Sequence, residues 1–326
     1  MHAWQVHSLG EPRDVLSWDE VQDPEAHAGT LRLRVDAVAL NFPDVLLCRG
    51  LYQEKPPLPF TPGLEVCGTV LDGPRSGERV LAAPGLPRGG LAEQVVVAEA
   101  AALAVPDAMP AATAASMLIT YQTGYVGLHR RAALQPGETL LVHAGAGGVG
   151  SAAIQLGKAA GARVIATAGG PEKVEVCRRL GADIAIDYVL EDFVPVVKDV
   201  TEGRGADVIY DCVGGDVFDK SRRCIAFEGR IVVVGFTGGR IADAPTNHAL
   251  VKNYSVVGLH WGLYRTQQPS VVPDTHAALI SLWEQGLVAP LVGAELSLSE
   301  APAALARLGD RGTIGKVVLL PGGSPI

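Results

Sequence analysis

Cysteine is scarce in this chain, and its few residues stand far apart. The five cysteines include no C-x-x-C pair, and this spacing argues against both a disulfide framework and a thiolate zinc site. Their small side chains suit positions in a core. We therefore expect a protein of a reducing compartment, the cytoplasm. The residues are Cys48, Cys67, Cys177, Cys212 and Cys224.

Long apolar runs and clusters of basic residues are also missing. No stretch is long enough to cross a bilayer, and residues 1–5 lack the charged-then-apolar pattern of a signal peptide. The net charge of −8 and the absence of a Lys/Arg-rich run argue against nucleic acid as a partner. What remains is a chain of 326 residues, enough for two domains of a soluble enzyme.

A glycine-rich turn stands between two apolar strand patterns, residues 139–143 and 163–168. Its glycines have the G-x-G-x-x-G spacing, and an amphipathic helix pattern follows them. Strand, glycine turn, helix and strand in this order predict a βαβ unit that binds the pyrophosphate of a dinucleotide at the start of the helix. The predicted contacts are Gly145, Gly147, Gly148, Val149 and Gly150.

The tip of the second strand carries no acid. NAD-binding sites of this type place Asp or Glu there to bind the ribose 2′-hydroxyl, but this chain reads Ala168-Gly169. Lys173 follows in the first turn of the next helix, where it can face a 2′-phosphate. Taken alone, Lys173 would be interpreted as a solvated helix residue, and Glu172 is an acid close by. The missing acid is what favours NADPH over NADH.

The strand and helix patterns divide the chain into three stretches. Residues 1–118 alternate polar and apolar residues in short strands between Gly/Pro turns, which predicts a compact β-rich domain. Residues 119–261 alternate strand and helix, with six strands in total, the number of a doubly wound dinucleotide fold. Residues 262–326 are too short for a core of their own. We expect them to pack on the first stretch and make a discontinuous catalytic domain.

Ligands of doubly wound folds bind outside the carboxyl ends of the strands. The loops after the last three predicted strands should therefore line the cofactor site, although each would also suit an ordinary turn. The residues concerned are Val213, Gly235, Phe236 and Leu259.

Six short motifs together resemble the zinc-free quinone oxidoreductases of the medium-chain dehydrogenase/reductase superfamily, over essentially the whole chain. They lie at residues 41–44, 50–52, 62–68, 123–125, 146–150 and 252–254. The resemblance implies an α/β protein with a GroES-like catalytic domain (residues 1–118 and 262–326) and a six-stranded parallel Rossmann domain that binds NADPH (residues 119–261). It also implies that Gly169, Lys173, Tyr188 and Arg311 hold the 2′-phosphate.

The resemblance gives a clear expectation about metal. The positions that hold catalytic zinc in alcohol dehydrogenases of this superfamily correspond to Asn41, Leu64 and approximately Ile119. Asn is a poor zinc ligand, and Leu and Ile cannot bind zinc. We therefore expect no metal site.

Without a metal to stabilise an alkoxide, a quinone or an α,β-unsaturated carbonyl is the easier hydride acceptor. Neutral hydrogen-bond donors can stabilise the oxygen that gains charge. By resemblance, Tyr52, Asn41 and Thr123 line the nicotinamide and acceptor pocket, with Tyr52 as the donor and Asn41 orienting the substrate or the carboxamide. Tyr52 would also suit a packed loop aromatic.

Three functions stay open: an NADPH-dependent quinone reductase, a reductase of enones or enoyl thioesters, and a non-catalytic NADPH-binding structural or regulatory protein.

Residues 253–261 would form the edge strand of the second domain. An apolar edge is prone to aggregation, so we expect a homodimer that covers it.

Overall fold

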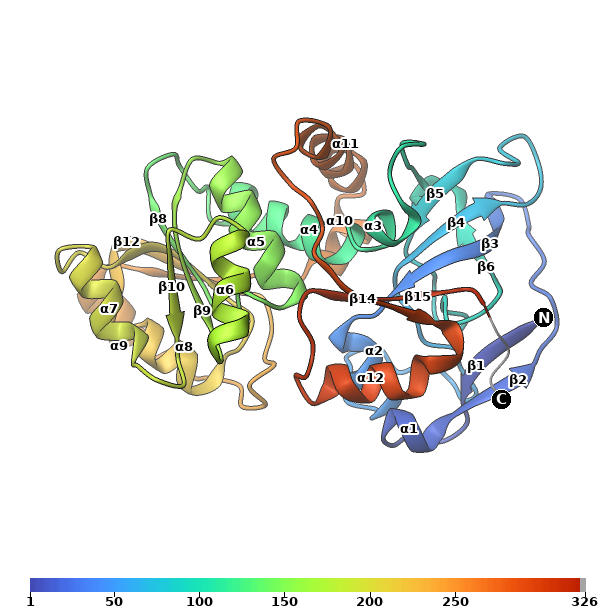
Figure 1. Ribbon diagram of the computed structural model, residues 1–326, viewed down its shortest axis with the longest axis horizontal. Coiled ribbons are helices and arrows are strands. Elements are labelled where there is room, and N and C mark those ends of the chain that lie inside the picture. Colours follow the sequence, from blue (N-terminus) through green and yellow to red (C-terminus); the bar gives the residue numbers. More distant parts are fainter. Residues whose placement is uncertain (323–326) are drawn as a thin grey trace. The chain divides into compact units, whose positions relative to one another are not determined.

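The computed structural model describes residues 1–322 and divides the chain into two compact units (Figure 1). Unit 1 contains Met1–Leu118 and the chain from Pro290 onward, and unit 2 contains Ile119–Ala289. Unit 1 is therefore built from both ends of the chain.

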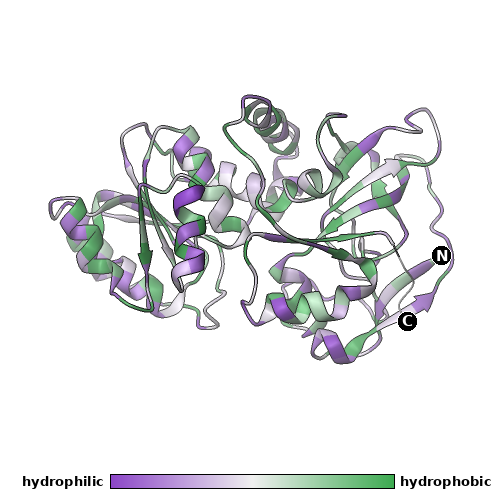
Figure 2. Cartoon of the chain, viewed as in Figure 1, coloured by the Kyte–Doolittle hydropathy of each residue, from purple (hydrophilic) through white to green (hydrophobic). Residues whose placement is uncertain are grey.

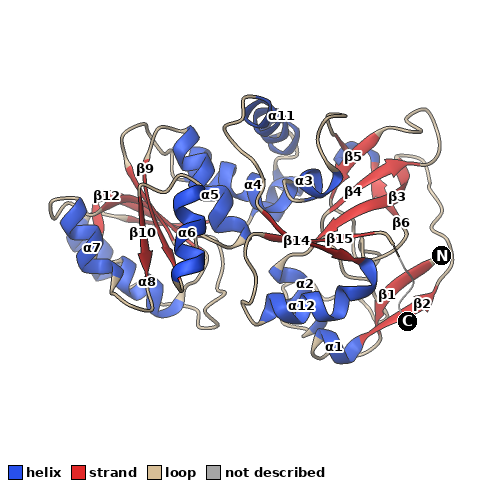
Figure 3. Cartoon of the chain, in the orientation of Figure 1, coloured by secondary structure: helices blue, strands red, loops and turns tan. Residues whose placement is uncertain are grey.

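Unit 2 is organised around one sheet of six parallel strands (Figure 3). The strand order is β10-β9-β8-β11-β12-β13, so the chain winds outward from the centre in both directions. This confirms the predicted doubly wound α/β fold. The strands are β8 (Thr139–Val142), β9 (Arg163–Ala168), β10 (Ile184–Asp187), β11 (Ala206–Asp211), β12 (Ile225–Val233) and β13 (Ser255–Gly258).

Helices connect these strands, and their sequences fit the sheet that they cover. Strand β8 is buried along its whole length, which explains its unbroken apolar run. Figure 2 shows both apolar and polar residues along α6, as expected of a helix with one face in water. The connecting helices are α5 (Gly148–Ala159), α6 (Pro171–Arg179), α7 (Phe193–Val200), α8 (Gly215–Ser221) and α9 (Thr246–Lys252). Helix α4 (Leu118–Tyr125) and a π-helix (η2, Val126–Arg131) precede β8.

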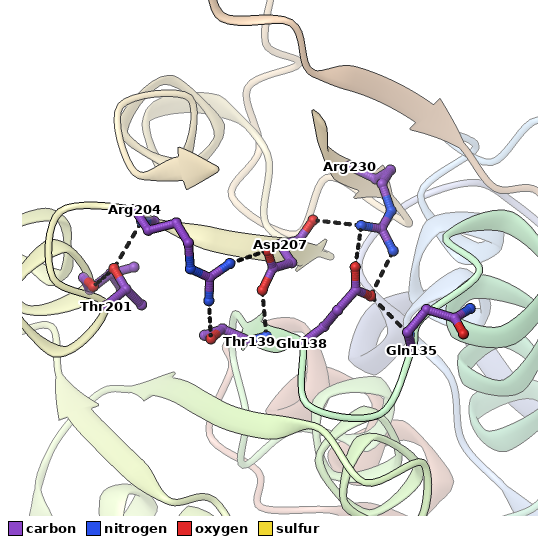
Figure 4. A network of polar contacts seen from close by, with 9 residues as sticks. Gln135, Glu138, Thr139, Thr201, Arg204, Asp207 and Arg230 are labelled. Carbon is purple, nitrogen blue, oxygen red and sulfur yellow. Dashed lines mark hydrogen bonds and ion pairs between the residues drawn. The ribbon is translucent and has the colours of Figure 1, made fainter. Parts of the chain in front are cut away.

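Polar side chains tie the strands together at the amino-terminal edge of the sheet (Figure 4). Asp207 Oδ2, in β11, accepts the backbone N–H of Thr139 at the start of β8 (2.7 Å). Arg230, in β12, binds Glu138 through two parallel hydrogen bonds of 2.8 Å. These contacts fix three neighbouring strands at one end, and the opposite, carboxyl end carries the loops predicted to bind the cofactor.

Unit 1 contains a mixed sheet of seven strands and a two-stranded sheet. The main order is β14-β15-β3-β4-β5-β7, and β6 also pairs with β3. Its strands are β3 (Thr30–Ala39), β4 (Val66–Val70), β5 (Arg79–Ala82), β6 (Gln94–Ala98), β7 (Leu103–Ala104), β14 (Val292–Ser297) and β15 (Lys316–Leu320). The other sheet pairs β1 (His2–Val6) with β2 (Leu16–Glu20). The helices are α1 (Pro12–Val15), α2 (Phe42–Cys48), α3 (Ala111–Ala115) and α12 (Ala301–Gly309).

The predicted boundary at residue 262 was wrong. Residues 262–289, which include α10 (Tyr264–Gln267) and α11 (Val271–Glu284), belong to unit 2. The side-chain amide of Gln155 in α5 holds their end, because it donates to Ala289 O (2.9 Å) and accepts from Ala289 N (2.6 Å). Arg130 also donates to Gln268 Oε1 (2.7 Å). Only the chain from Pro290 returns to unit 1.

Strand β12 continues from Ile225 to Val233 even though it contains Glu228 at φ +57° followed by Gly229, a pair typical of a turn. No helix within residues 1–322 has the length and apolar character needed to cross a membrane.

Candidate functional site

A tight glycine-rich turn joins β8 to α5. The N–H of Gly145 donates to Thr167 O in β9 (2.9 Å), and the N–H of Gly147 donates to Ala144 O (2.9 Å). A Cβ on Gly150 would lie 2.2 Å from Ala144 O, so this position cannot hold a side chain. The three glycines thus bring the backbone of the turn close to the start of the helix.

The turn leaves a cradle of backbone at the N-terminus of α5. Gly148 and Val149 open this twelve-residue helix. The N–H groups of its first turn have no acceptor within the helix. Backbone N–H groups and the positive end of the helix dipole favour an anion here. The cradle fits the pyrophosphate of a dinucleotide, as the sequence predicts.

His143 lies directly before this turn and is buried. Ser221 Oγ donates to Val217 O (2.7 Å), so it accepts from His143 Nε2 (2.8 Å), and Nδ1 accepts from Thr167 Oγ1 (3.0 Å). Burial lowers the pKa of His143 to about 4. The imidazole is therefore neutral at pH 7 and joins β8, β9 and α8 as a structural group.

The tip of β9 meets a tyrosine from the end of β10. A Cβ on Gly169 would lie 2.6 Å from Tyr188 Oη, so only glycine lets the phenol approach. Tyr188 keeps 57% of its surface exposed, which leaves room for a ligand beside it. Lys173 is the third residue of α6 and is half-buried. The structure thus brings Gly169, Lys173 and Tyr188 to adjacent segments of unit 2.

A carboxylate also lies beside this tip, which the sequence pattern did not reveal. Asp187, the last residue of β10, pairs with Ala168 in β9. Its Oδ1 accepts the N–H groups of Gly170 (2.9 Å) and Val189 (3.0 Å). The carboxylate therefore holds together the two loops that follow β9 and β10.

The loops after β11, β12 and β13 follow strands that end at the same edge of the parallel sheet. The N–H of Gly238 donates to Val213 O (2.8 Å), and a Cβ on Gly214 would lie 2.9 Å from Phe236 Cδ1, so the first two loops touch. Phe236 is 42% exposed, whereas Leu259 is buried. The predicted loop residues at this edge are Val213, Gly235, Phe236 and Leu259.

Unit 1 contains a buried polar cluster around Asn41. Lys316 Nζ lies 2.7 Å from Asn41 Oδ1 and 3.0 Å from Glu65 Oε2. Asp44 accepts the N–H groups of Asn41 (2.8 Å) and Gly63 (2.9 Å). Burial raises the pKa of Asp44 to about 6, although both backbone hydrogen bonds and the charge of Lys316 act in the opposite direction.

The other predicted residues are divided between the two units. Tyr52, in the loop after α2, is partly buried and packs against the cluster that contains Phe60. Thr123 lies in α4 of unit 2 and is 8% exposed. Arg311 follows α12 in unit 1 at φ +59°, whereas Lys173 belongs to unit 2.

Within residues 1–322, no group of three His, Cys, Asp or Glu side chains is arranged to hold a metal ion. Leu64 packs against the cluster around Phe60.

Sequence reasoning missed Lys316 as a site residue. A lysine that opens an apolar strand at residues 316–320 was a signal, because a buried ammonium needs partners.

Comparisons with known proteins agree with this architecture. The family model for an alcohol dehydrogenase GroES-like domain matches residues 27–107, and the model for a zinc-binding dehydrogenase matches residues 148–277. The chain is 38% identical over 325 residues to a quinone oxidoreductase-like protein 2 homolog of Nematostella vectensis, with 97% of this chain and 88% of that protein covered.

Solved structures resemble both units. The quinone oxidoreductase of Thermus thermophilus, described with its NADPH complex, has a TM-score of 0.88 and 35% identity, over 98% of this chain and 100% of that chain. A 2-haloacrylate reductase has a TM-score of 0.85 and 29% identity, over 99% and 100% of the two chains.

Proposed function

The chain belongs to the quinone oxidoreductase family of the medium-chain dehydrogenase/reductase superfamily, and we propose that it is an NADPH-dependent oxidoreductase that reduces a quinone. One observation carries the cofactor assignment: the tip of β9 ends in Ala168-Gly169 without an acid, and Tyr188 Oη lies against Gly169. The glycine cradle before α5 supports a dinucleotide, and this tip supports the phosphorylated one.

Gly145, Gly147, Gly148, Val149 and Gly150 bind the pyrophosphate through backbone N–H groups. Gly169, Lys173 and Tyr188 hold the 2′-phosphate, in which Lys173 supplies positive charge and Tyr188 a hydroxyl. Val213, Gly235, Phe236 and Leu259 flank the nicotinamide half of the cofactor. NADPH, when bound, supplies the hydride.

Tyr52 and Asn41, both in unit 1, serve the acceptor. The quinone takes up the hydride and becomes a hydroquinone monoanion, whose charged oxygen needs a hydrogen-bond donor and then a proton. The hydroxyl of Tyr52 is the neutral donor for this oxygen, and solvent restores its proton. No metal takes part in this proposal, since Asn41 and Leu64 stand where zinc-dependent relatives carry ligands.

A second acceptor class has specific support. The similarity to a 2-haloacrylate reductase links this fold to reduction of a conjugated double bond. Hydride addition to an enone or enoyl thioester places the charge on an enolate oxygen, which the same tyrosine can stabilise. The two acceptor classes therefore need the same machinery.

We also propose a homodimer formed through β13. This strand is the edge of the sheet in unit 2, and Val256 in it is 39% exposed. Phe227, Leu250 and Val251 are more than two-thirds exposed on the neighbouring β12 and α9. Pairing with a second copy would cover this apolar edge. Sedimentation at micromolar concentration should show a dimer for the wild type and a monomer for Val256→Asp.

The acceptor panel tests the function. NADPH absorbance is followed with 1,4-benzoquinone, 9,10-phenanthrenequinone, an enone and crotonyl-CoA, and each rate is compared with that of Tyr52→Phe. Quinone reduction that falls at least tenfold in the variant supports the proposal. Turnover of the enone or thioester alone assigns the second class. NADPH binding without any turnover identifies a non-catalytic protein and contradicts the proposal.

A further inference from the structure

The ammonium of Lys316 is completely hydrogen-bonded in a buried place. Its Nζ donates to Leu40 O (2.9 Å), Asn41 Oδ1 (2.7 Å) and Glu65 Oε2 (3.0 Å). An ammonium has three hydrogens, so these three acceptors use all of them. The side chain of Lys316 is 3% exposed and that of Glu65 is 0% exposed. Bulk water therefore cannot replace a hydrogen-bond partner that either side chain loses.

These contacts determine which way the amide of Asn41 points. Its Nδ2 donates to Ala39 O (3.0 Å) and Glu65 Oε2 (3.0 Å), while its Oδ1 faces Lys316. A lysine only donates, and a carbonyl or carboxylate oxygen only accepts. The reversed amide would place an NH2 against the ammonium and an oxygen against two acceptors. Chemistry therefore permits one orientation.

The arrangement also limits what Asn41 can offer to a bound molecule. Both Nδ2 hydrogens are already donated, and one of the two Oδ1 lone pairs already accepts. The remaining lone pair is the one open hydrogen-bonding valence of the amide. Asn41 retains 6% exposure, so its side chain is almost wholly enclosed.

We propose that Lys316 is a positioning residue for the reductase: its ammonium locks Asn41 so that the amide meets the bound reactants only as a hydrogen-bond acceptor. This inference rests on the proposed function, in which Asn41 lines the pocket. It assigns Asn41 to a donor group such as the N–H of a carboxamide. Donation to the reduced oxygen is then left to Tyr52.

A purely structural role for Lys316 is a different hypothesis, because its contacts also connect several elements of unit 1. Lys316 opens β15, Glu65 precedes β4 and Asn41 precedes α2, so these three hydrogen-bonded residues join three elements. If Lys316 and Glu65 had a purely structural role, their substitution would change stability, and its effect on turnover would be the same with or without Asn41. A positioning residue must lose its effect on turnover once Asn41 is gone.

A double-mutant cycle distinguishes the positioning role of Lys316 from a purely structural one. Lys316→Met is combined with Glu65→Gln, so that the carboxylate of Glu65 is not left without its ammonium partner. This double variant is made both in the wild-type protein and in Asn41→Ala. We expect kcat/KM for the quinone to fall about tenfold with Asn41 present and less than about twofold with Asn41→Ala. Equal losses in both backgrounds overturn the inference.

Arg230→Met/Glu138→Gln is the matched control. It removes a half-buried ion pair from the amino edge of the sheet in unit 2, outside the proposed site. Its kcat/KM should match the wild type at a temperature where both are folded. A tenfold loss in this control would show that loss of any buried pair impairs turnover, and would overturn the assignment to Lys316.

Nuclear magnetic resonance tests the orientation without turnover. In ¹⁵N-asparagine-labelled protein, the Asn41 Nδ2 signal, assigned by its loss in Asn41→Ala, should exchange its protons slowly. In the folded Lys316→Met/Glu65→Gln variant, exchange should be at least about tenfold faster. Unchanged exchange contradicts the inference. If the wild type reduces no acceptor, the proposed function fails, and this measurement still decides the role of Lys316.

Discussion

Lys316 Nζ and Glu65 Oε2 lie 3.0 Å apart, and neither side chain has access to bulk water. Two opposite charges in such a place satisfy each other, but either one alone would be an uncompensated charge in the core. The pair sits beside Asn41, so the electrostatics of the core and the geometry of the proposed site depend on the same contact.

This pairing predicts an asymmetric response of stability. Lys316→Met should lower the free energy of unfolding by about 3–5 kcal/mol, because Glu65 loses the ammonium that neutralises it. Lys316→Met/Glu65→Gln should recover more than half of that loss. Urea unfolding measures both values. A single variant as stable as the wild type would mean that the two charges are not coupled in the folded protein.

The raised pKa of Asp44 predicts that its contribution to the free energy of unfolding falls as pH rises, the opposite of what most carboxylates do. Burial raises its pKa to about 6 in the folded protein from the ordinary 3.8. Between these values the folded state holds more protons than the unfolded state, so the contribution of Asp44 to stability is full below about pH 4 and falls as pH rises to about 6. The full change is about 3 kcal/mol.

The measurement is the midpoint of urea unfolding across pH 4–7 for the wild type and for Asp44→Asn. The variant should lose this downward slope with rising pH. Asp107→Asn, at an exposed position, is the control and should keep it. Identical profiles for all three proteins would show that Asp44 titrates normally despite its burial.

Gly150→Ala should damage the dinucleotide cradle. A Cβ there meets Ala144 O at 2.2 Å, and the backbone of the turn must move away from the start of α5. We expect the Kd of NADPH, measured by fluorescence titration, to rise at least about tenfold. Gly85→Ala is the control, because a Cβ at Gly85 meets nothing within 4 Å. Normal NADPH affinity in Gly150→Ala would show that the turn does not hold the pyrophosphate.

Lys173→Ala should separate the two nicotinamide cofactors. Loss of a charge beside the 2′-phosphate should weaken NADPH binding about ten- to a hundredfold and leave NADH binding nearly unchanged. Lys198→Ala, on the exposed face of α7, should affect neither. An equal loss for both cofactors in Lys173→Ala would assign this residue to the fold of α6.

The doubly wound unit was predictable because its signals are local. Strand β9 has the predicted bounds, residues 163–168, since a mostly apolar segment between a glycine and a turn is typical of a buried parallel strand. The junction near residue 290 was not predictable. It depends on the contact of Gln155 with Ala289, and two residues 134 positions apart leave no local pattern.

The same limit applies to the site. The glycine spacing at residues 145–150 locates the cradle because one turn contains all its parts. The partnership of Lys316 with Glu65 spans 251 residues, and only the pairing of β15 with β3 and of β3 with β4 brings the two together. Asp187 was missed for a similar reason, because its neighbour Ala168 is on another strand.

Calorimetric titration of the wild type with NADPH and with NADH tests the central claim most directly, namely that the tip of β9 with Lys173 and Tyr188 selects the 2′-phosphate. The account predicts that NADPH binds at least about tenfold more tightly than NADH, and that added salt narrows the difference. Equal affinities at low salt would contradict it.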